Sequence, residues 1–438
     1  MGHFAGNDIY RNLGEKIDNL TFRVPWNETL HAILTELYST EEADVIINMP
    51  YTLSPFDRIE KTTNYEKTLL RKILDSLCSK GLVIDLWIND EYQYMPSPIV
   101  IGIFEFTMMR SGHGPDGIKK IARLFHKYLQ DEVDFYAANF TDNERVSIIR
   151  TVPHEEVIKE SASIEILDYE RAKFLIEESK KLAIGICSCR QTMMHGDEKK
   201  CDTPLNTCSS FGFAADFMVR HKFAEEVSKA EMLDNLARSK EMGLVLNADN
   251  VRKNITFLCH CCGCCCHALL GISKLGYPNS VVTSSFLAET DQDRCIGCGK
   301  CARACPIHAV EMHTIENPGT KKKKKPVTDS AICLGCGVCA LKCETGALKL
   351  VKRGKRVIHP ETTFGRILLQ CLERGTLQNQ LFDNPASMTH KFMRGFVGGF
   401  LKLTPVKKAL MSDMLRSTFL NAMKKGIVRQ GRGWIAEL

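Results

Sequence analysis

Apolar residues in the region 41–110 recur at the spacing of short amphipathic helices. The segments expected to be helical are 41–49, 54–63 and 64–81. Ser54 is the expected N-cap of the second helix, with Pro55 at its first position, and Asn64 is the expected N-cap of the third. Gly81 follows the last apolar position and is expected to end that helix.

A hairpin is expected directly after these helices. Residues 83–88 and 91–95 are rich in strand-forming side chains and flank the pair Asn89 and Asp90, which suits a two-residue turn. Three helices followed by such a hairpin predict a winged-helix-like module. Acidic and basic side chains are mixed on its third helix and on the hairpin, which favours a protein-binding adaptor over a DNA-binding domain.

The middle of the chain shows a different pattern. Segments 168–181 and 228–243 have the period of amphipathic helices, and the second opens with a capping box formed by Ser228 and Glu231. The sequence IEIL at 164–167, the first of these helices and LAIGICSC at 182–189 together predict a β-α-β unit. That unit would place Cys187 and Cys189 at the end of a strand.

Basic and apolar residues are interleaved in the C-terminal segment. Residues 391–425 contain eight Lys or Arg against one Asp, interleaved with Phe, Leu and Met. Such a helical tail suits three uses: contact with an anionic membrane surface, docking into a partner subunit, or packing on the chain's own core. The pattern leaves all three open.

Composition adds one decisive observation, which is the number of thiols. The chain has 438 residues, of which 44% are hydrophobic and 25% charged, and it contains 20 cysteines. Neither an apolar run of 18 residues nor a signal-peptide-like N-terminus is found, so a cytoplasmic protein is expected. In a reducing compartment, so many thiols indicate metal ligands rather than disulfides.

Two cysteine runs have the spacing of bacterial two-cluster ferredoxins. Residues 295–306 spell CIGCGKCARACP, and residues 333–343 spell CLGCGVCALKC. In such pairs, three cysteines of each run bind one [4Fe–4S] cube and the fourth binds the other cube. The first predicted set is Cys295, Cys298, Cys301 and Cys343. The second is Cys333, Cys336, Cys339 and Cys305. A pair of zinc knuckles, which would need four ligands in paired CxxC units, does not account for the third CxxC step.

Two charged features accompany these runs. Glu344 stands where the first run has Pro306, and it is expected to lower the potential of the nearby cube slightly. Lys321 to Lys325 form a basic run, expected in a loop between the two cysteine runs. It is either a solvated loop or a docking site for an acidic redox partner.

A second field of ten cysteines lies upstream. Its members are Cys187, Cys189, Cys201, Cys208, Cys259, Cys261, Cys262, Cys264, Cys265 and Cys266. Neighbouring residues in an extended chain point to opposite faces, so the CC pairs cannot all serve one small cluster. Two further [4Fe–4S] clusters are the favoured interpretation, with one zinc ion or one less usual cluster as the alternative. His260 and His267 are expected to support the site rather than to ligate.

The order of these motifs resembles a known group of proteins. The resemblance is carried by CSCR at 187–190, CDTPLNTCSSFGFAADF at 201–217, TFLCHCCGCCCHALLGISKLGYPNSVV at 256–282 and the ferredoxin runs, and it extends to 81–106. The chain is similar to large ferredoxin-domain iron–sulfur proteins of anaerobic bacteria and archaea. The resemblance implies cytoplasmic electron transfer in anaerobic metabolism, without naming a donor or an acceptor.

The expected fold class is α+β with several domains. The expected segments are an N-terminal arm (1–40), a winged-helix-like and helical module (41–150), a cysteine-rich iron–sulfur α+β domain (151–290), a two-[4Fe–4S] ferredoxin domain (291–352) and a basic helical tail (353–438). Two [4Fe–4S] clusters are expected, and up to four in all.

The expected function follows from these domains. It is single-electron transfer between a low-potential donor and a partner oxidoreductase, because no P-loop, nucleophile elbow or zincin motif offers a site for substrate chemistry. The expected partners are redox proteins, with peripheral contact at the inner face of the cytoplasmic membrane through the tail; nucleic acid is not favoured. The alternatives are an oxidoreductase with its own active site at the ten-cysteine field and a redox-responsive winged-helix regulator.

Overall fold

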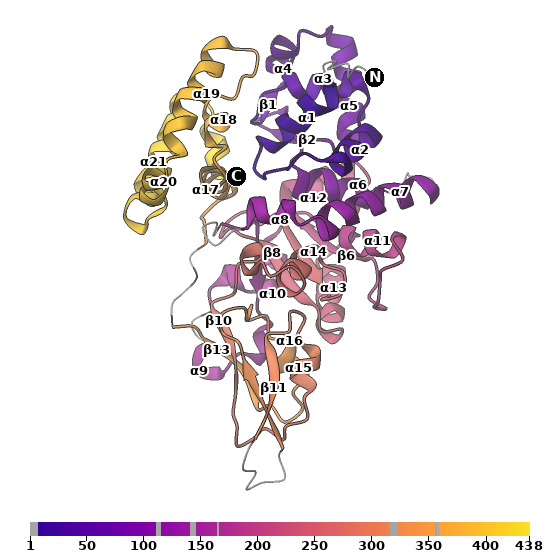
Figure 1. The fold of residues 1–438 in the computed structure, drawn as a ribbon, viewed down its shortest axis with the longest axis vertical. Coiled ribbons are helices and arrows are strands. Elements are labelled where there is room, and N and C mark those ends of the chain that lie inside the picture. The colour runs from indigo at the N-terminus through magenta and orange to yellow at the C-terminus, as the bar shows by residue number, and fades with distance from the viewer. Residues whose placement is uncertain are drawn as a thin grey trace, which may run out of the picture. The chain divides into compact units, whose positions relative to one another are not determined.

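The chain divides into two compact units (Figure 1). The computed structural model describes residues 8–110, 115–140, 146–163, 166–315, 323–354, 357 and 359–438. Unit 1 consists of Met1–Val146, Phe217–Phe223 and Glu361–Leu438, and unit 2 of Ser147–Asp216 and Ala224–Pro360. All ten cysteines of the upstream field and both ferredoxin-like runs belong to unit 2. Among the described residues, no helix has both the length and the apolar character needed to cross a bilayer.

Unit 1 begins with helices and a small antiparallel sheet. The elements are α1 (Ile9–Asp18), α2 (Glu28–Leu37), α3 (Thr40–Asn48), β1 (Ser54–Pro55), α4 (Phe56–Thr63), α5 (Lys67–Lys80), β2 (Val83–Ile88) and β3 (Glu91–Pro96). The strands lie in the order β1-β3-β2. Asn89 and Asp90 both have positive φ, 52° and 61°, as the predicted two-residue turn requires. The three helices and the hairpin predicted for this region are therefore confirmed.

The predicted helix caps, however, were wrong at two places. Ser54 and Pro55 form β1, and Pro55 precedes α4 without a side-chain cap. Asn64 ends α4 in the left-handed conformation, with φ of 56°, instead of starting α5. The N-cap of α5 is Glu66, whose carboxylate accepts from the backbone N–H groups of the first turn. Asparagine is common at both ends of helices, so the residue type alone does not show whether Asn64 ends α4 or begins α5.

The remaining helices of unit 1 come from both ends of the chain. They are α6 (Phe104–Met109), α7 (Pro115–His126), α8 (Asp134–Asn139), α17 (Thr363–Arg374), α18 (Leu377–Leu381), α19 (Met388–Leu401), α20 (Thr404–Met411) and α21 (Asp413–Arg429). Leu368, Leu372 and Leu401 are among the buried residues that join the C-terminal helices to one another. Cys371 and Thr376 donate hydrogen bonds to the Leu20 carbonyl oxygen, at 3.8 and 2.9 Å. The tail thus packs on the chain's own N-terminal region.

Asp383 anchors this packing. Its carboxylate accepts two hydrogen bonds from Arg58, at 2.7 and 2.9 Å, and one from Thr52, and it lies 3.6 Å from a guanidinium nitrogen of Arg432. Only 5% of Asp383 is exposed. Burial acts to raise the pKa of this carboxyl, but the hydrogen bonds and charge of Arg58 outweigh it, so the pKa lies below its usual value.

Replacing Asp383 with asparagine is expected to lower the free energy of unfolding by about 3 kcal/mol, since it leaves guanidinium groups without their buried partner. A carboxyl whose pKa is lower in the folded state contributes stability above its unfolded pKa and loses it as pH falls through the folded pKa. The difference between the two proteins in urea unfolding should therefore shrink below about pH 4. Asp57→Asn, at an exposed position, is the control; an equal difference at all pH values would contradict the assignment.

Unit 2 is built on a six-stranded antiparallel sheet. In the order of the sheet the strands are β4 (Ile149–Val152), β8 (Val245–Asp249), β9 (Phe257–Cys261), β6 (Asn206–Phe211), β5 (Leu182–Ile186) and β7 (Ala224–Glu226). Helices α10 (Ala172–Glu178) and α13 (Lys229–Glu241) bury Ile176 and Met232 in one core with the sheet. The capping box of Ser228 and Glu231 is present as predicted.

The strand expected before Cys187 is present as β5. The predicted β-α-β unit, which requires a parallel neighbour for this strand, was wrong. Both described neighbours of β5 run antiparallel to it. Residues 164–165 of the expected first strand lie outside the described residues. Two helices begin directly after cysteines of the upstream field: α11 (Ser188–His195) follows Cys187, and α14 (His267–Ser273) follows Cys266.

The ferredoxin-like part of unit 2 consists of two antiparallel strand pairs and two short helices. The strands are β10 (Phe286–Thr290) with β13 (Leu348–Lys352) and β11 (Val310–Thr314) with β12 (Lys324–Thr328), and the helices are α15 (Lys300–Ala304) and α16 (Val338–Leu341). Lys324 and Lys325 of the basic run lie in β12 and not in a loop, because they pair with β11. Residues 321–322 of that run lie outside the described residues.

Candidate metal centres

Each ferredoxin-like cysteine set lines a cavity of its own. Cys295, Cys298, Cys301 and Cys343 line one cavity. Cys305, Cys333, Cys336 and Cys339 line the other. The structure therefore brings together the same two sets that the spacing predicted, including the exchange of Cys305 and Cys343 between the runs. Four thiols around a cavity form a donor set suited to a [4Fe–4S] cube.

Backbone N–H groups point at the sulfurs of these cavities. Gly297 donates to the Cys295 sulfur at 3.4 Å, Ala309 to Cys305 at 3.2 Å and Leu348 to Cys343 at 3.4 Å. Such bonds stabilise thiolates and tune the potential of a bound cluster.

Gly335 shows how closely the backbone wraps the second cavity. It has φ of +66°, and an added Cβ would meet the Phe286 carbonyl oxygen and the Ser284 hydroxyl. A side chain at this position would clash with these atoms and displace the loop that lines the cavity, so glycine is required here.

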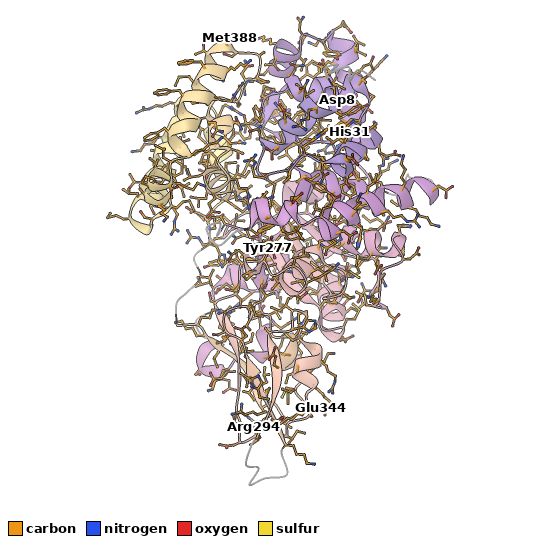
Figure 2. All side chains as sticks on the ribbon, in the orientation of Figure 1. Asp8, His31, Tyr277, Arg294, Glu344 and Met388 are labelled. Atoms are coloured by element: carbon orange, nitrogen blue, oxygen red, sulfur yellow. The ribbon has the colours of Figure 1, made fainter. Side chains whose placement is uncertain are left out.

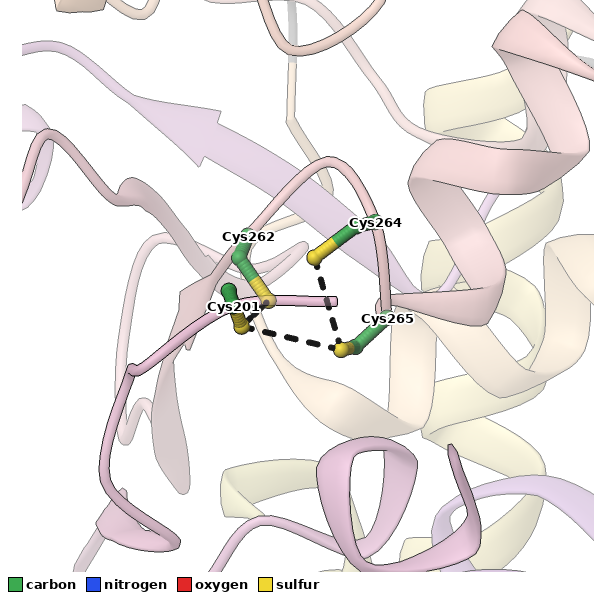
Figure 3. Close-up of side chains that lie close together, drawn as sticks. All are labelled: Cys201, Cys262, Cys264 and Cys265. Carbon is green, nitrogen blue, oxygen red and sulfur yellow. Dashed lines mark hydrogen bonds between the residues drawn. The ribbon is translucent and has the colours of Figure 1, made fainter. Parts of the chain in front are cut away.

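Four cysteines of the upstream field form a much tighter group (Figure 3). The sulfur of Cys201 lies 3.7 Å from that of Cys262 and 3.9 Å from that of Cys265, and Cys264 lies 3.6 Å from Cys265. All four sulfurs lie within 4.8 Å of one another. A tetrahedral ion with metal–sulfur bonds of about 2.3 Å requires sulfur separations of about 3.8 Å. This arrangement suits a single ion such as Zn²⁺ better than a cube.

The surroundings of this four-cysteine group are apolar. Met193, Leu244 and Leu270 pack with it. The hydrogen bond from Cys265 lowers the pKa of Cys262 to about 5, so this sulfur is readily available as a thiolate ligand. Cys262, Cys264 and Cys265 lie at a turn that approaches the ferredoxin-like part, since a Cβ on Gly263 would meet the backbone of Pro306 at 2.6 Å.

The other six cysteines of the field form a closed ring. The pKa of each thiol is shifted by contact with two others, and these contacts run in order through Cys187, Cys189, Cys266, Cys261, Cys259 and Cys208. We call this group the six-thiol ring. The ten cysteines are thereby divided into four and six, a partition that the sequence did not give.

The sheet explains this partition. Cys259 and Cys261 are two residues apart on β9, so both point to the same face, and Cys208 lies on the neighbouring strand β6. The chain leaves β9 after Cys261, and Cys262 joins the four-cysteine group. Cys265 and Cys266 are likewise divided between the two groups.

Arg190 connects the two groups and was not among the predicted site residues. It is fully buried, and it donates hydrogen bonds to Thr207 at 2.5 Å and to the His260 carbonyl oxygen. Burial acts to lower the pKa of Arg190, but the negative charges of Cys187 and Cys262 outweigh it and raise the pKa. The arginine in CSCR, directly after two cysteines, was the available sequence signal.

His260 points away from the thiols. It lies between Cys259 and Cys261 on β9, hence on the opposite face, and its Nε2 is 2.9 Å from the Ser209 hydroxyl. Burial, followed by the charge of Arg190, lowers the pKa of His260 to about 3, so the imidazole of His260 is neutral. His260 therefore has a supporting position and not a ligating one.

Comparison with known proteins identifies one part of the chain. Residues 294–347 match the family described as a 4Fe-4S dicluster domain. Searches of curated proteins and of solved structures found no match. The dicluster domain implies two [4Fe–4S] clusters, and the four-cysteine group of Cys201 could hold a further metal.

The two cluster sites of the dicluster domain differ in exposure. Cys298 in the first site is exposed, whereas Cys305, Cys333, Cys336 and Cys339 of the second are all buried. Burial raises the pKa of Cys336 to about 12, so only a bound metal would hold its thiolate at neutral pH. The first site thus lies nearer to solvent.

Glu344 lies at the surface of the dicluster domain (Figure 2). Its carboxylate forms an ion pair with Lys300, and 75% of the Glu344 side chain is exposed. A charge that is paired and solvated acts weakly on a neighbouring cluster. The decrease in the potential of the neighbouring cluster that is expected from Glu344 should therefore be small.

Proposed function

We propose that this protein is an iron–sulfur electron-transfer component that passes single electrons between a low-potential donor and a partner oxidoreductase. One observation carries the proposal: one dicluster domain contains two four-cysteine cavities, and Cys305 and Cys343 are exchanged between the runs that build them. When bound, a [4Fe–4S] cube supplies one-electron chemistry. The surrounding residues bind the cubes, donate N–H groups to the sulfurs and exclude water from the second site.

The proposal is tested by redox titration of the whole chain, purified without oxygen. Dithionite should reduce two centres of the dicluster domain, each visible by electron paramagnetic resonance. Cys298→Ser should remove one signal and Cys336→Ser the other, whereas Cys78→Ser, at a buried cysteine of unit 1, should remove neither. Redox-inactive metal in this domain, such as zinc, would overturn the proposal.

A basic surface beside the first cluster site supports docking of an acidic partner. Met312 and Pro326 line that site, and Lys325 directly precedes Pro326 on β12. Lys324 and Lys325 are exposed, and Ile296, which also lines the site, is 64% exposed. An apolar contact next to lysines is suited to a partner with an acidic rim.

Replacing Lys324 and Lys325 with glutamine is expected to slow oxidation of the reduced chain by ferricyanide. The decrease should be about tenfold at low ionic strength, and the salt dependence should flatten, since electrostatic steering of the anion is lost. Stopped-flow absorbance measures both. Hexaammineruthenium(III), a cation, is the matched control acceptor; an equal slowing with this cation would refute steering.

We further propose that α19 binds anionic lipid, as part of a cytoplasmic protein with peripheral membrane contact. Met388, Phe392, Phe396 and Phe400 recur every fourth residue and are 57–78% exposed, and the neighbouring Lys391 and Lys402 are exposed as well. An aromatic stripe flanked by lysines is typical of helices that lie in a bilayer interface.

The chain is accordingly expected to float with phosphatidylglycerol vesicles and not with phosphatidylcholine vesicles. Phe392→Ser combined with Phe396→Ser should abolish flotation, because the inserted apolar area is lost. Met414→Ser, at an exposed methionine of α21, is the control. Absence of flotation with anionic vesicles would end the membrane proposal.

We assign the region 41–110 as a winged-helix-like adaptor. The order α3-β1-α4-α5-β2-β3, with the strands in one antiparallel sheet, supports this assignment. Lys67 and Arg71 on α5 are cations, but they lie over the Phe56 ring at 5.9 and 4.6 Å. Salt-sensitive binding of duplex DNA in a gel-shift assay would instead support the redox-responsive regulator.

A further inference from the structure

Unit 1 contains a cavity that the electron-transfer proposal does not use. Its volume is about 560 Å³, within the range of about 300–1,000 Å³ that is typical of small-molecule sites. The lining residues come from β1, α4 and β3 near the N-terminus and from the C-terminal region 381–434, and all of them belong to unit 1 (Figure 1). The packing that Asp383 anchors therefore also shapes this cavity.

One part of the cavity wall is cationic. Arg58, Arg432 and His390 line it together with Asp383 and Glu91. Among the described acidic residues of the lining, only Asp383 is buried, and its oxygens lie 2.7 Å from Arg58 and 3.6 Å from Arg432. Burial lowers the pKa of Arg432 although Asp383 opposes this, and the charge of Arg58 lowers it further. Two cations thus share one buried carboxylate, so a second anion in the cavity would reduce the repulsion between them.

Both guanidinium groups keep N–H donors for such an anion. A guanidinium has five N–H donors. Within the described part of the chain, Arg58 donates three hydrogen bonds, two to Asp383 and one to the Ser54 hydroxyl, and Arg432 donates two, both to residues 52–53. Because both side chains line the cavity, the remaining donors are available to an anion placed there. The planar fork of a guanidinium matches the oxygens of a phosphate group.

Another part of the wall suits a planar ring. Trp434, in a short 3₁₀ helix (Gly433–Glu437), and Phe382 give the cavity aromatic surface, on which a heteroaromatic ring can stack. Gln93 also lines the cavity, is buried and donates to Glu91 at 2.8 Å. An amide has two donors and an acceptor oxygen, so Gln93 can also bind the polar edge of a ring.

We propose that this cavity binds a mononucleotide, with its phosphate on Arg58 and Arg432 and its planar ring on Trp434. A phosphate ion alone would leave the aromatic surface without a contact, and a ring without a phosphate would leave the cations without an anion. Nucleoside monophosphates and flavin mononucleotide share the chemistry that satisfies both parts of the wall. The proposal is independent of the electron-transfer function, because the cavity lies in unit 1 and all the cysteine sites lie in unit 2.

The test is isothermal titration calorimetry of the whole chain, purified without oxygen. The probes are flavin mononucleotide and AMP, and the matched ligands without a phosphate are riboflavin and adenosine. At least one mononucleotide should bind about tenfold or more tightly than its matched ligand, since the guanidinium groups bind the phosphate. The mononucleotide that binds identifies the ring. The proposal is overturned if neither mononucleotide binds, if the phosphate adds no affinity, or if inorganic phosphate binds as tightly as the mononucleotide.

Two variants place the ligand in this cavity. Arg432→Gln and Trp434→Leu should each weaken binding of the mononucleotide about tenfold or more, because one removes a cation and the other removes the stacking surface. Arg429→Gln is the matched control, since Arg429 is exposed on α21 and lies outside the lining residues. Unchanged affinity in both lining variants would refute the site. If a variant does not fold, the comparison of ligands on the wild-type chain decides whether a mononucleotide binds.

Discussion

Replacing Cys201 with serine is expected to release one zinc ion per chain and to destabilise unit 2. The sulfur separations of 3.6 to 3.9 Å suit a tetrahedral ion, and zinc is the usual ion in closed Cys₄ sites. Binding of structural zinc contributes about 10–16 kcal/mol in small domains, so losing one of four ligands should lower the free energy of unfolding by several kcal/mol. Metal analysis together with anaerobic urea unfolding measures both effects.

Cys371→Ser is a suitable control for this variant, because Cys371 is buried in unit 1, whereas both cysteine fields belong to unit 2. It should keep the zinc. If the Cys201→Ser protein loses about four irons with matching sulfide, the group does not bind a single ion. It would then bind a [4Fe–4S] cube. About one iron without sulfide, in place of zinc, would keep the single-ion geometry and change only the metal.

Replacing Arg190 with glutamine is expected to lower the free energy of unfolding of unit 2 by about 3–5 kcal/mol. The guanidinium is fully buried, and its charge faces thiolates of both upstream groups. Glutamine keeps a polar side chain but removes the cation, so the thiolates would remain buried without their partner. Any cluster held by the ring should also become harder to reduce, since a positive charge beside it is lost.

Anaerobic urea unfolding and redox titration together test this expectation. Arg190→Lys keeps the charge but cannot reproduce the hydrogen bonds to Thr207 and to the His260 carbonyl, so an intermediate loss of stability is expected. The midpoint potential should then stay near that of the wild type. A glutamine variant as stable as the wild type, with the same potential, would show that the charge of Arg190 is not needed.

Local signals in the sequence were sufficient for several elements. The turn at Asn89 and Asp90, the capping box at Ser228 and the strand before Cys187 depend on residues close in the chain. The caps at Ser54 and Asn64 were wrong, because asparagine and serine fit more than one end of an element. The pairing of β5 was also wrong, since strand direction depends on partners distant in sequence.

The sequence by itself determined the two cysteine sets of the dicluster domain, because a cube wrapped by C-x2-C-x2-C fixes its ligands through local spacing. It also predicted that ten further thiols form a metal-binding field, and four of them could hold a further metal. Only the tertiary structure decided how that field divides. The pairing of β6 with β9 brings Cys208 beside Cys259, and the turn after Cys261 sends Cys262 to Cys201. These contacts join residues about 50 to 60 positions apart, and the sheet register and the turn after β9 set them, not a spacing motif.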